Sequence, residues 1–228
     1  MIGNNNWTPL HLAAENGHLS VVEYLINQEA DVNVKNNGNW TPLHLAARYG
    51  HLSVVKYLVN QKAIINEKQS LSQTPLHLAA HNGHLSVVEF LVNQKVDINA
   101  KNIISQTPLH LATINGHLSI VEYLINHKAD INACNNINLT PLHLAAINGH
   151  LSVVEYLVNQ KSETNVNNDG KWTPLHLAAR YGHLSVVKYL VNQNVDINAI
   201  CYNVEFDYVI GPLFIMLLKM VIFILLNF

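Results

Sequence analysis

The chain has 228 residues with 13 basic and 15 acidic side chains, which gives a formal net charge of −2 at pH 7. A composition so close to neutral, without a dense basic patch or a Gly-rich phosphate loop, argues against a nucleic-acid or nucleotide partner. The two cysteines, Cys134 and Cys201, indicate free thiols in a reducing compartment rather than a disulfide framework. Because Met1 to Asn6 leave no room for a signal peptide before the first motif, we expect a cytoplasmic protein.

A seven-residue motif, Thr-Pro-Leu-His-Leu-Ala-Ala, recurs along the chain, with Thr113 replacing the last alanine in one copy. The copies begin at Thr8, Thr41, Thr74, Thr107, Thr140 and Thr173, so each start lies 33 residues after the previous one. A fixed period of this length indicates one supersecondary unit copied in tandem. In such an array each unit stacks only on its neighbours, and the product is a long surface rather than a pocket.

The motif predicts a short first helix in every copy. In the second copy, Thr41 provides a hydroxyl N-cap and Pro42 occupies the first helical position, where its missing N–H has no cost. Small residues follow, so another helix can approach closely. Gly50 ends this helix, because glycine adopts the left-handed conformation without strain.

A second helix is predicted at about residues 51–60, followed by an Asn- and Gly-rich segment that favours a turn or hairpin, as in residues 31–40. The apolar residues of this helix predict one buried stripe with helical periodicity. The stripe consists of Leu52, Val55, Leu58 and Val59. Lys56 is then expected on the outer face of the helix.

These residues closely resemble the ankyrin repeat. The resemblance extends from Trp7 to about Ala199 and rests on the Thr-Pro-Leu-His start, the Ala-Ala-x-x-Gly-His-Leu turn, the Val-Val…Leu helix and the Ala-Asp-Val-Asn hairpin with its variants. It implies an all-α solenoid, in which each repeat is a helix-turn-helix followed by a hairpin loop. Six repeats then form one domain over residues 1–199, and residues 200–228 form a separate tail.

The chain departs from the family pattern where the family usually has glycine. After the second helix stand Glu29, Lys62, Lys95, Lys128, Lys161 and Asn194. In the hairpin stand Asn39, Ser72, Ser105, Asn138 and Lys171. If these positions keep a left-handed backbone, each side chain costs roughly 1 kcal/mol or more. We therefore expect an array that folds with a reduced margin of stability.

Fourteen histidines raise the question of a metal or catalytic site, but twelve of them belong to the repeat itself. Six follow Thr-Pro-Leu and are expected to bond back to the threonine and lock the helix start, and six follow glycine and are expected to fix the turn between the helices. The hairpin asparagines Asn33, Asn99, Asn132 and Asn198 are likewise expected to tie their turns to backbone. A catalytic site needs residues that differ from their surroundings, and no zinc-ligand spacing occurs. The sequence predicts no enzyme, no metal and no cofactor.

The tail is apolar and lies outside the repeat. Residues 211–228 contain one lysine, Lys219, and as a membrane span they are short of the ~20 residues usually needed. Reading possible codons across residue boundaries offers an alternative: Met220–Val221 permits only Gly, Lys219–Met220 permits only Asn or Asp, and the whole stretch can spell the repeat motif again in another frame. We interpret the tail as an out-of-frame seventh repeat; a membrane anchor is the alternative.

In ankyrin proteins, partners usually lie along the concave face made by hairpin tips and first helices, so positions that vary between copies are the candidates. Here the centre is apolar and the flanks carry Arg, Tyr and Trp, which are enriched at binding hot spots. The candidates are Trp40, Arg48, Tyr49, His81, Ile103, Ile104, Ile114, Ile137, Leu139, Ile147, Trp172, Arg180 and Tyr181. The near-identity of the second and sixth copies leaves drift after a recent duplication as an alternative explanation.

The predicted function is that of a non-enzymatic, cytoplasmic scaffold that binds another protein through this concave surface. One alternative is a membrane-tethered adaptor anchored by residues 211–228. Another is the binding fragment of a larger effector or enzyme.

Overall fold

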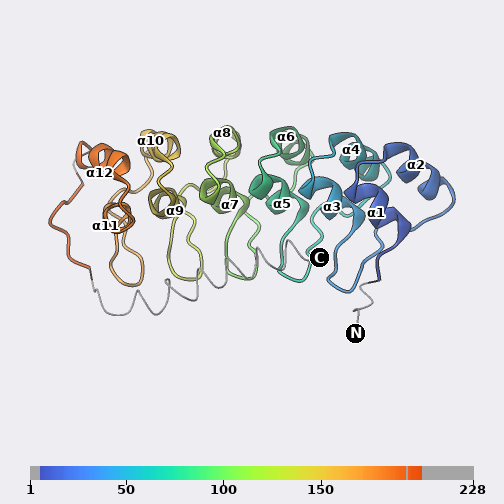
Figure 1. The fold of residues 1–228 in the computed structure, drawn as a ribbon, viewed down its shortest axis with the longest axis horizontal. Helices are drawn as coiled ribbons and strands as arrows, with labels where there is room; N and C mark the ends of the chain where they lie inside the picture. The colour runs from blue at the N-terminus through green and yellow to red at the C-terminus, as the bar shows by residue number, and fades with distance from the viewer. Residues whose placement is uncertain (1–5, 194, 202–228) are drawn as a thin grey trace.

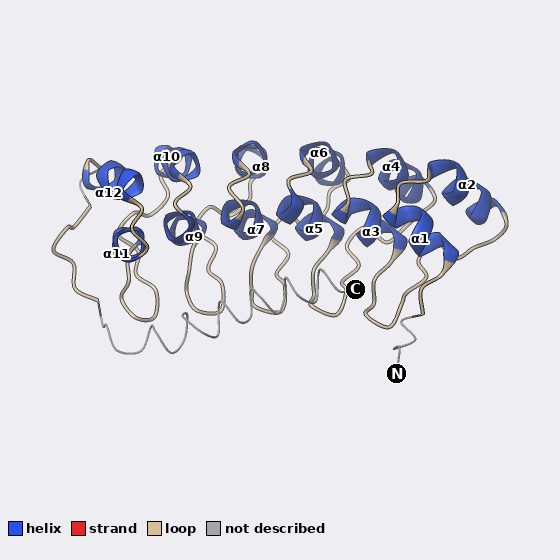
Figure 2. Cartoon of the chain, in the orientation of Figure 1, coloured by secondary structure: helices blue, strands red, loops and turns tan. Residues whose placement is uncertain are grey.

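The computed structural model describes residues 6–193 and 195–201. Within these ranges the chain forms twelve helices and no strand (Figures 1 and 2). In chain order they are α1 Pro9–Glu15, α2 Leu19–Asn27, α3 Pro42–Arg48, α4 Leu52–Asn60, α5 Pro75–Asn82, α6 Leu85–Asn93, α7 Pro108–Ile114, α8 Leu118–Asn126, α9 Pro141–Asn148, α10 Leu151–Asn159, α11 Pro174–Arg180 and α12 Leu184–Val191. The predicted all-α architecture is confirmed.

The helices pair into six units that stack in a single row. Figure 1 shows the odd-numbered first helices in one layer, the even-numbered second helices in another, and the connecting hairpin loops projecting together on the side of the first helices. Each first helix packs against the first helices of its neighbours and against the second helix of its own unit. The core is therefore continuous along the array, from Leu10 in α1 to Leu190 in α12.

The start of each first helix is fixed by a reciprocal cap, as the sequence predicts. At α3 the Thr41 hydroxyl accepts the His44 N–H (3.4 Å), and His44 Nδ1 accepts the Thr41 N–H (3.2 Å). Histidine thus plays the part that Glu or Gln plays in the usual capping box. Pro42 at the first helical position lacks only an N–H that would have no helical partner.

The second helix differs from the prediction in its start and in its buried face. In the second unit it begins at Leu52, and His51 precedes it as the N-cap residue. Val54 and Val55 are both fully buried, whereas the predicted stripe contained only Val55. The first unit shows why both valines are buried. In α2 Val21 is exposed and Val22 is fully buried, because no unit precedes α1 among the described residues. The first valine of each pair therefore faces the preceding unit and the second faces the following one.

The positions that lack the family's glycine are left-handed. The residue after the second helix has φ between 59° at Lys95 and 72° at Lys128, and the hairpin residue has φ between 55° at Asn138 and 59° at Asn39. These values confirm that non-glycine residues carry backbone strain at both places in the repeat. Asn194, the last of the first series, lies outside the described residues.

The predictions for the tail also concern residues outside the described ranges, since these end at Cys201. The out-of-frame repeat and the membrane anchor at residues 211–228 both stay predictions. Of the helices that the structure describes, none is long and apolar enough to span a bilayer.

Candidate partner-binding surface

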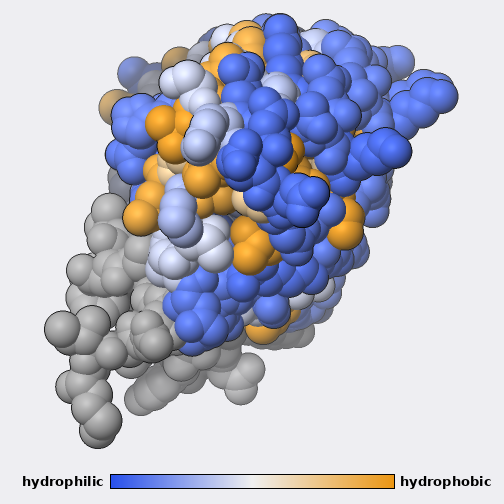
Figure 3. Space-filling model, turned by 90° about the vertical axis from the view of Figure 1, so that its right-hand side faces the viewer, coloured by the Kyte–Doolittle hydropathy of each residue, from blue (hydrophilic) through white to orange (hydrophobic). Residues whose placement is uncertain are grey.

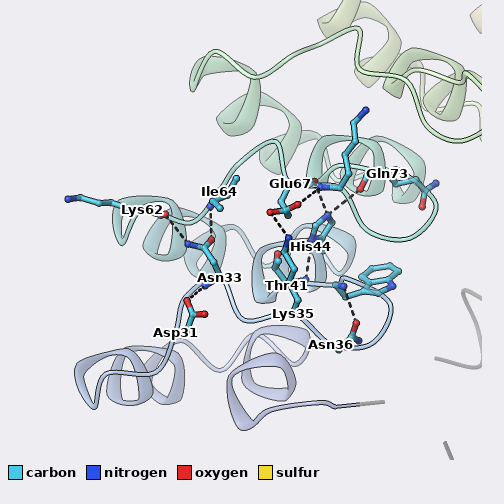
Figure 4. Close-up of polar contacts among 12 residues, drawn as sticks. Asp31, Asn33, Lys35, Asn36, Thr41, His44, Lys62, Ile64, Glu67 and Gln73 are labelled. Atoms are coloured by element: carbon cyan, nitrogen blue, oxygen red, sulfur yellow. Dashed lines mark hydrogen bonds and ion pairs between the residues drawn. The ribbon is translucent and has the colours of Figure 1, made fainter. Parts of the chain in front are cut away.

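In the first five units, the histidine of the Thr-Pro-Leu-His motif joins its unit to the next one, whereas in the sixth unit His176 Nε2 donates to the Ala199 carbonyl (2.9 Å). His44 Nε2 donates to the backbone carbonyls of Glu67 (3.0 Å) and Gln73 (3.2 Å), as Figure 4 shows, while its Nδ1 lies 2.8 Å from the Thr41 hydroxyl. The same forward bond links His11 to Trp40 (2.9 Å). It recurs for His77, His110 and His143 at 3.1 to 3.2 Å. The local cap was predicted, but this bond between units was not.

These hydrogen bonds require a neutral imidazole. Nδ1 accepts from the threonine N–H, so the single ring proton is on Nε2, where it is donated to a carbonyl. Burial lowers the pKa of His44 and His77 to about 4, although their backbone acceptors act in the opposite direction. The pKa of His110 and His143 is lowered to about 4 for the same reason. Neutral histidines of this kind are structural supports rather than poised acids or bases.

The histidine that follows glycine points the other way along the array. His84 Nε2 donates to the Arg48 carbonyl of the preceding unit (2.9 Å), and its ring packs on Gly50. Gly50 has φ +78°, and a Cβ there would lie 2.5 Å from His84 Nδ1. This glycine is therefore required both by its left-handed backbone and by the ring above it. The predicted role within the turn was incomplete, because the ring also reaches the preceding unit.

A third set of contacts runs through the hairpin asparagines. Asn33 Oδ1 accepts the N–H of Ile64 in the next unit (2.8 Å), and the Asp31 carboxylate accepts the Asn33 N–H (2.9 Å), as Figure 4 shows. Asn99 and Asn132 repeat the forward bond at 2.9 and 3.2 Å. An ion pair between Lys35 and Glu67 (3.0 Å) lies beside it. The side chains of Asn33, Asn99 and Asn132 therefore bond to backbone as predicted, but to the backbone of the following unit. At Asn198 the bond is a local one, from its own N–H to the Asp196 carboxylate (2.9 Å).

Most apolar candidates of the central units lie around a second hydrophobic cluster, which is separate from the main core. Its buried members are Leu139, Leu144, Trp172 and Leu177, and Ile114, Ile137 and Ile147 pack against it while partly exposed. Leu139 is fully buried and Trp172 is only 4% exposed. These two predicted site residues therefore lie beneath the surface, where they support the isoleucines above them.

The hairpin tips extend this apolar region outward. Ile103 is 65% exposed, and its N–H donates to the Leu71 carbonyl of the preceding hairpin (3.0 Å). Ile104 is partly exposed, and its carbonyl accepts the Asn136 N–H of the next hairpin (3.2 Å). Successive hairpins are thus held side by side by backbone hydrogen bonds. Ile103 and Ile104 therefore sit on an ordered part of the array.

The flanking candidates form stacked cation–aromatic groups. The Arg48 guanidinium lies 5.4 Å from the ring centres of both Trp40 and Tyr49, and Arg180 lies 5.2 Å from that of Trp172. Burial raises the pKa of Tyr49, and the nearby carboxylate of Glu15 acts in the same direction. Such stacking holds the long arginine side chains in place and so reduces the entropy lost when a partner binds.

The remaining two candidates lie at the ends of first helices, His81 in the last turn of α5 and Tyr181 directly after α11. His81 is partly buried, its Nδ1 accepts from Asn115 Nδ2 (3.1 Å), and burial with the neighbouring charges of His117 and Arg48 lowers its pKa. Tyr181 is 39% exposed after α11. The structure thus places eleven of the thirteen predicted residues at least partly at the surface, on first helices, their turns and hairpins. In the described part of the chain, no three His, Cys, Asp or Glu side chains are grouped to hold a metal ion.

Comparison with known families gives a direct result. The model of the family described as ankyrin repeats matches residues 2–69, 63–135 and 130–201. The chain belongs to the ankyrin-repeat family. Ankyrin repeats are generally protein-interaction modules. No curated protein matches the chain.

Proposed function

We propose that this ankyrin-repeat protein is a non-enzymatic, cytoplasmic scaffold that binds another protein through the concave surface made by its hairpin tips and first helices. The observation that carries the proposal is the contrast between invariant and variable positions. The residues that join the repeats are copied almost without change, whereas the residues after each first helix and at the hairpin tips change from copy to copy. The variable set combines partly exposed isoleucines with stacked arginines and aromatics, the side-chain types that dominate binding energy in protein interfaces.

The surface is also ordered before any partner arrives. The Arg48 guanidinium lies over the rings of Trp40 and Tyr49, Ile103 and Ile104 lie on hydrogen-bonded hairpins, and Leu139 packs against the isoleucines. Pre-organised contacts of this kind lower the entropy loss of association. They favour a folded partner or a peptide laid across several repeats over a small molecule in a pocket.

A photo-crosslinking side chain placed at Tyr49, and separately at Glu89 on α6, tests the location of the site in cells. We expect a specific protein adduct from position 49 and none from position 89. With the captured protein purified, Arg48→Ala, Tyr49→Ala and Ile114→Ala should each weaken binding by roughly 1–2 kcal/mol, as hot-spot truncations do. Glu89→Ala should leave the affinity unchanged.

Circular dichroism of each variant controls for folding, since none of these side chains belongs to the buried core. Equal adducts from both positions, or full affinity after all three substitutions, would overturn the proposal. The second outcome would instead favour an idle surface that records duplication.

A further inference from the structure

The N-terminal end of the array exposes apolar side chains that the interior units bury. Leu12 is 50% exposed and Val21 is 44% exposed, whereas their counterparts Leu45 and Val54 are 1% and 0% exposed. Figure 3 looks onto this end and shows hydrophobic side chains among hydrophilic ones. We call Leu12, His18, Val21 and Tyr24 the N-terminal face; all four are exposed.

The opposite end of the described array exposes the complementary side of a repeat. Leu184 is 63% exposed, and Ala179 is exposed although its counterpart Ala47 is fully buried. Gly182 has φ +76° and nothing within 4 Å of the place where a Cβ would stand, whereas Gly50 at the same position is covered by the His84 ring. We call Ala179, Gly182, Leu184 and Val187 the C-terminal face.

The sequence shows what fits the C-terminal face. Residues 172–193 are identical to residues 40–61, so α11 and α12 present the same side chains that α3 and α4 present to α5 and α6. The surface that covers α3 and α4 belongs to residues 74–94. Residues 8–28 repeat those residues except at Glu15, Tyr24 and Ile26. The first repeat is therefore a near-copy of the unit that already packs on this face elsewhere in the chain.

If the first repeat of one molecule packed on the sixth repeat of another, the contacts seen between repeats inside the array could form again. His18 would cover Gly182 and donate to the Arg180 carbonyl, as His84 covers Gly50 and donates to the Arg48 carbonyl at 2.9 Å. Tyr24 would meet Lys188, because Lys56 lies 5.9 Å from the ring centre of its counterpart Phe90.

The change at position 15 adds charge complementarity. His81 lies close enough to Arg48 for the two positive charges to oppose each other, which contributes to the lowered pKa of that histidine. Glu15 occupies the position of His81, and Arg180 occupies the position of Arg48. Between two molecules this pair places opposite charges together, whereas the internal pair has no negative charge to face Arg48.

We propose that the N-terminal face of one molecule binds the C-terminal face of a second copy, in the register that joins consecutive repeats within the chain. The interface is heterologous and leaves a free face at each end, so association continues into open-ended chains rather than closing as a dimer. Of the thirteen predicted partner-binding residues, this interface uses only Arg180, through its backbone carbonyl and its charge, and it also uses Glu15 at the equivalent position of the first repeat. It stands or falls separately from the proposed function.

Sedimentation velocity of the purified full-length chain over a range of concentrations tests this proposal without any partner. We expect a series of species whose mean mass rises with concentration. Val21→Glu on the N-terminal face, or Leu184→Glu on the C-terminal face, should weaken association by about a hundredfold or more, because an unpaired carboxylate would be buried. Ile64→Glu, at a 51% exposed site away from both faces, is the matched control and should associate as the original chain does.

Mixing the two variants gives the decisive result. Val21→Glu keeps an intact C-terminal face and Leu184→Glu keeps an intact N-terminal face, so each alone should be monomeric while the mixture forms a heterodimer that grows no further. Unchanged circular dichroism shows that the variants are folded. A monomeric original chain at every concentration, association that survives either substitution, or a mixture without a heterodimer would each overturn the proposal.

Discussion

The second and sixth repeats have the same sequence from Trp to Gln, residues 40–61 and 172–193, but not the same environment. Their first helices have equal lengths and the same threonine cap, which shows that the local sequence decides where the helix begins. Burial differs: Leu43 is 1% exposed whereas Leu175 is only partly buried, and Trp40 is partly exposed whereas Trp172 is buried beside Leu139. Neighbouring repeats, rather than the repeat's own residues, therefore decide which side chains contribute to the core.

The largest difference between inner and end repeats should come from acid, which destabilises the repeats that have neighbours on both sides. The histidines with a pKa lowered to about 4 are His44, His77, His110 and His143. The unfolded chain binds protons at these positions below pH 6.5 and the folded chain only near pH 4. The free energy of unfolding should therefore be constant above pH 6.5. It should fall as the pH is lowered from 6.5 to 4, by about 1.4 kcal/mol per pH unit for each histidine. Urea unfolding at a series of pH values measures this; a flat profile from pH 6.5 to 4 would contradict it.

A matched pair of leucine truncations measures the value of a following repeat. Leu43→Ala should lower the free energy of unfolding by about 3 kcal/mol, because it leaves a cavity in a closed core. Leu175→Ala removes the same side chain from the same sequence, but from a partly exposed site, and should cost about half as much. Urea unfolding of both variants provides the test, and equal losses would mean that the two repeats are equally enclosed.

The turn glycines offer a second pair. Gly50→Ala and Gly182→Ala both place a Cβ at a left-handed backbone, which costs about 1 kcal/mol. Only Gly50 is covered by a histidine ring, so its substitution should cost about 2 kcal/mol more through the displaced contact. Thermal unfolding would show this as a larger drop in Tm for Gly50→Ala than for Gly182→Ala. Equal drops would mean that the contact with the histidine ring does not contribute.

The smallest expected effect is a gain. Lys95→Gly after α6 relieves a residue at φ +59° and should raise the free energy of unfolding by about 0.5–1 kcal/mol, since the relief exceeds the added entropy of the unfolded chain. Lys56→Gly inside α4 is the control and should destabilise by about 1 kcal/mol. A loss of stability at position 95 would show that Lys95 is held by interactions that outweigh its backbone strain.

Much of the fold could be predicted from the sequence because the signals are local and repeated. A threonine before proline, a glycine at the turn and apolar residues at helical spacing act within a few residues of one another. The error at the second helix arises because its second valine contact is not local. Periodicity in one helix predicts one buried stripe, and it cannot show that Val54 and Val55 face different neighbouring repeats. Likewise, the hairpin candidates Leu139 and Trp172 were predicted at the surface but are buried by each other's repeats.

The sequence by itself determined the helices, their caps, the left-handed positions and the order of the units, since each depends on a residue's own backbone preferences and on side chains within one turn. The tertiary structure decided which nitrogen of each histidine reaches which neighbour, which valine faces which side, and which apolar residues remain exposed at the two ends. Those outcomes depend on groups about one repeat away in sequence, such as His44 and Gln73 or His84 and Arg48. Stacking of the repeats brings these groups into contact, and the sequence pattern of a single repeat cannot show which groups of a neighbouring repeat will meet.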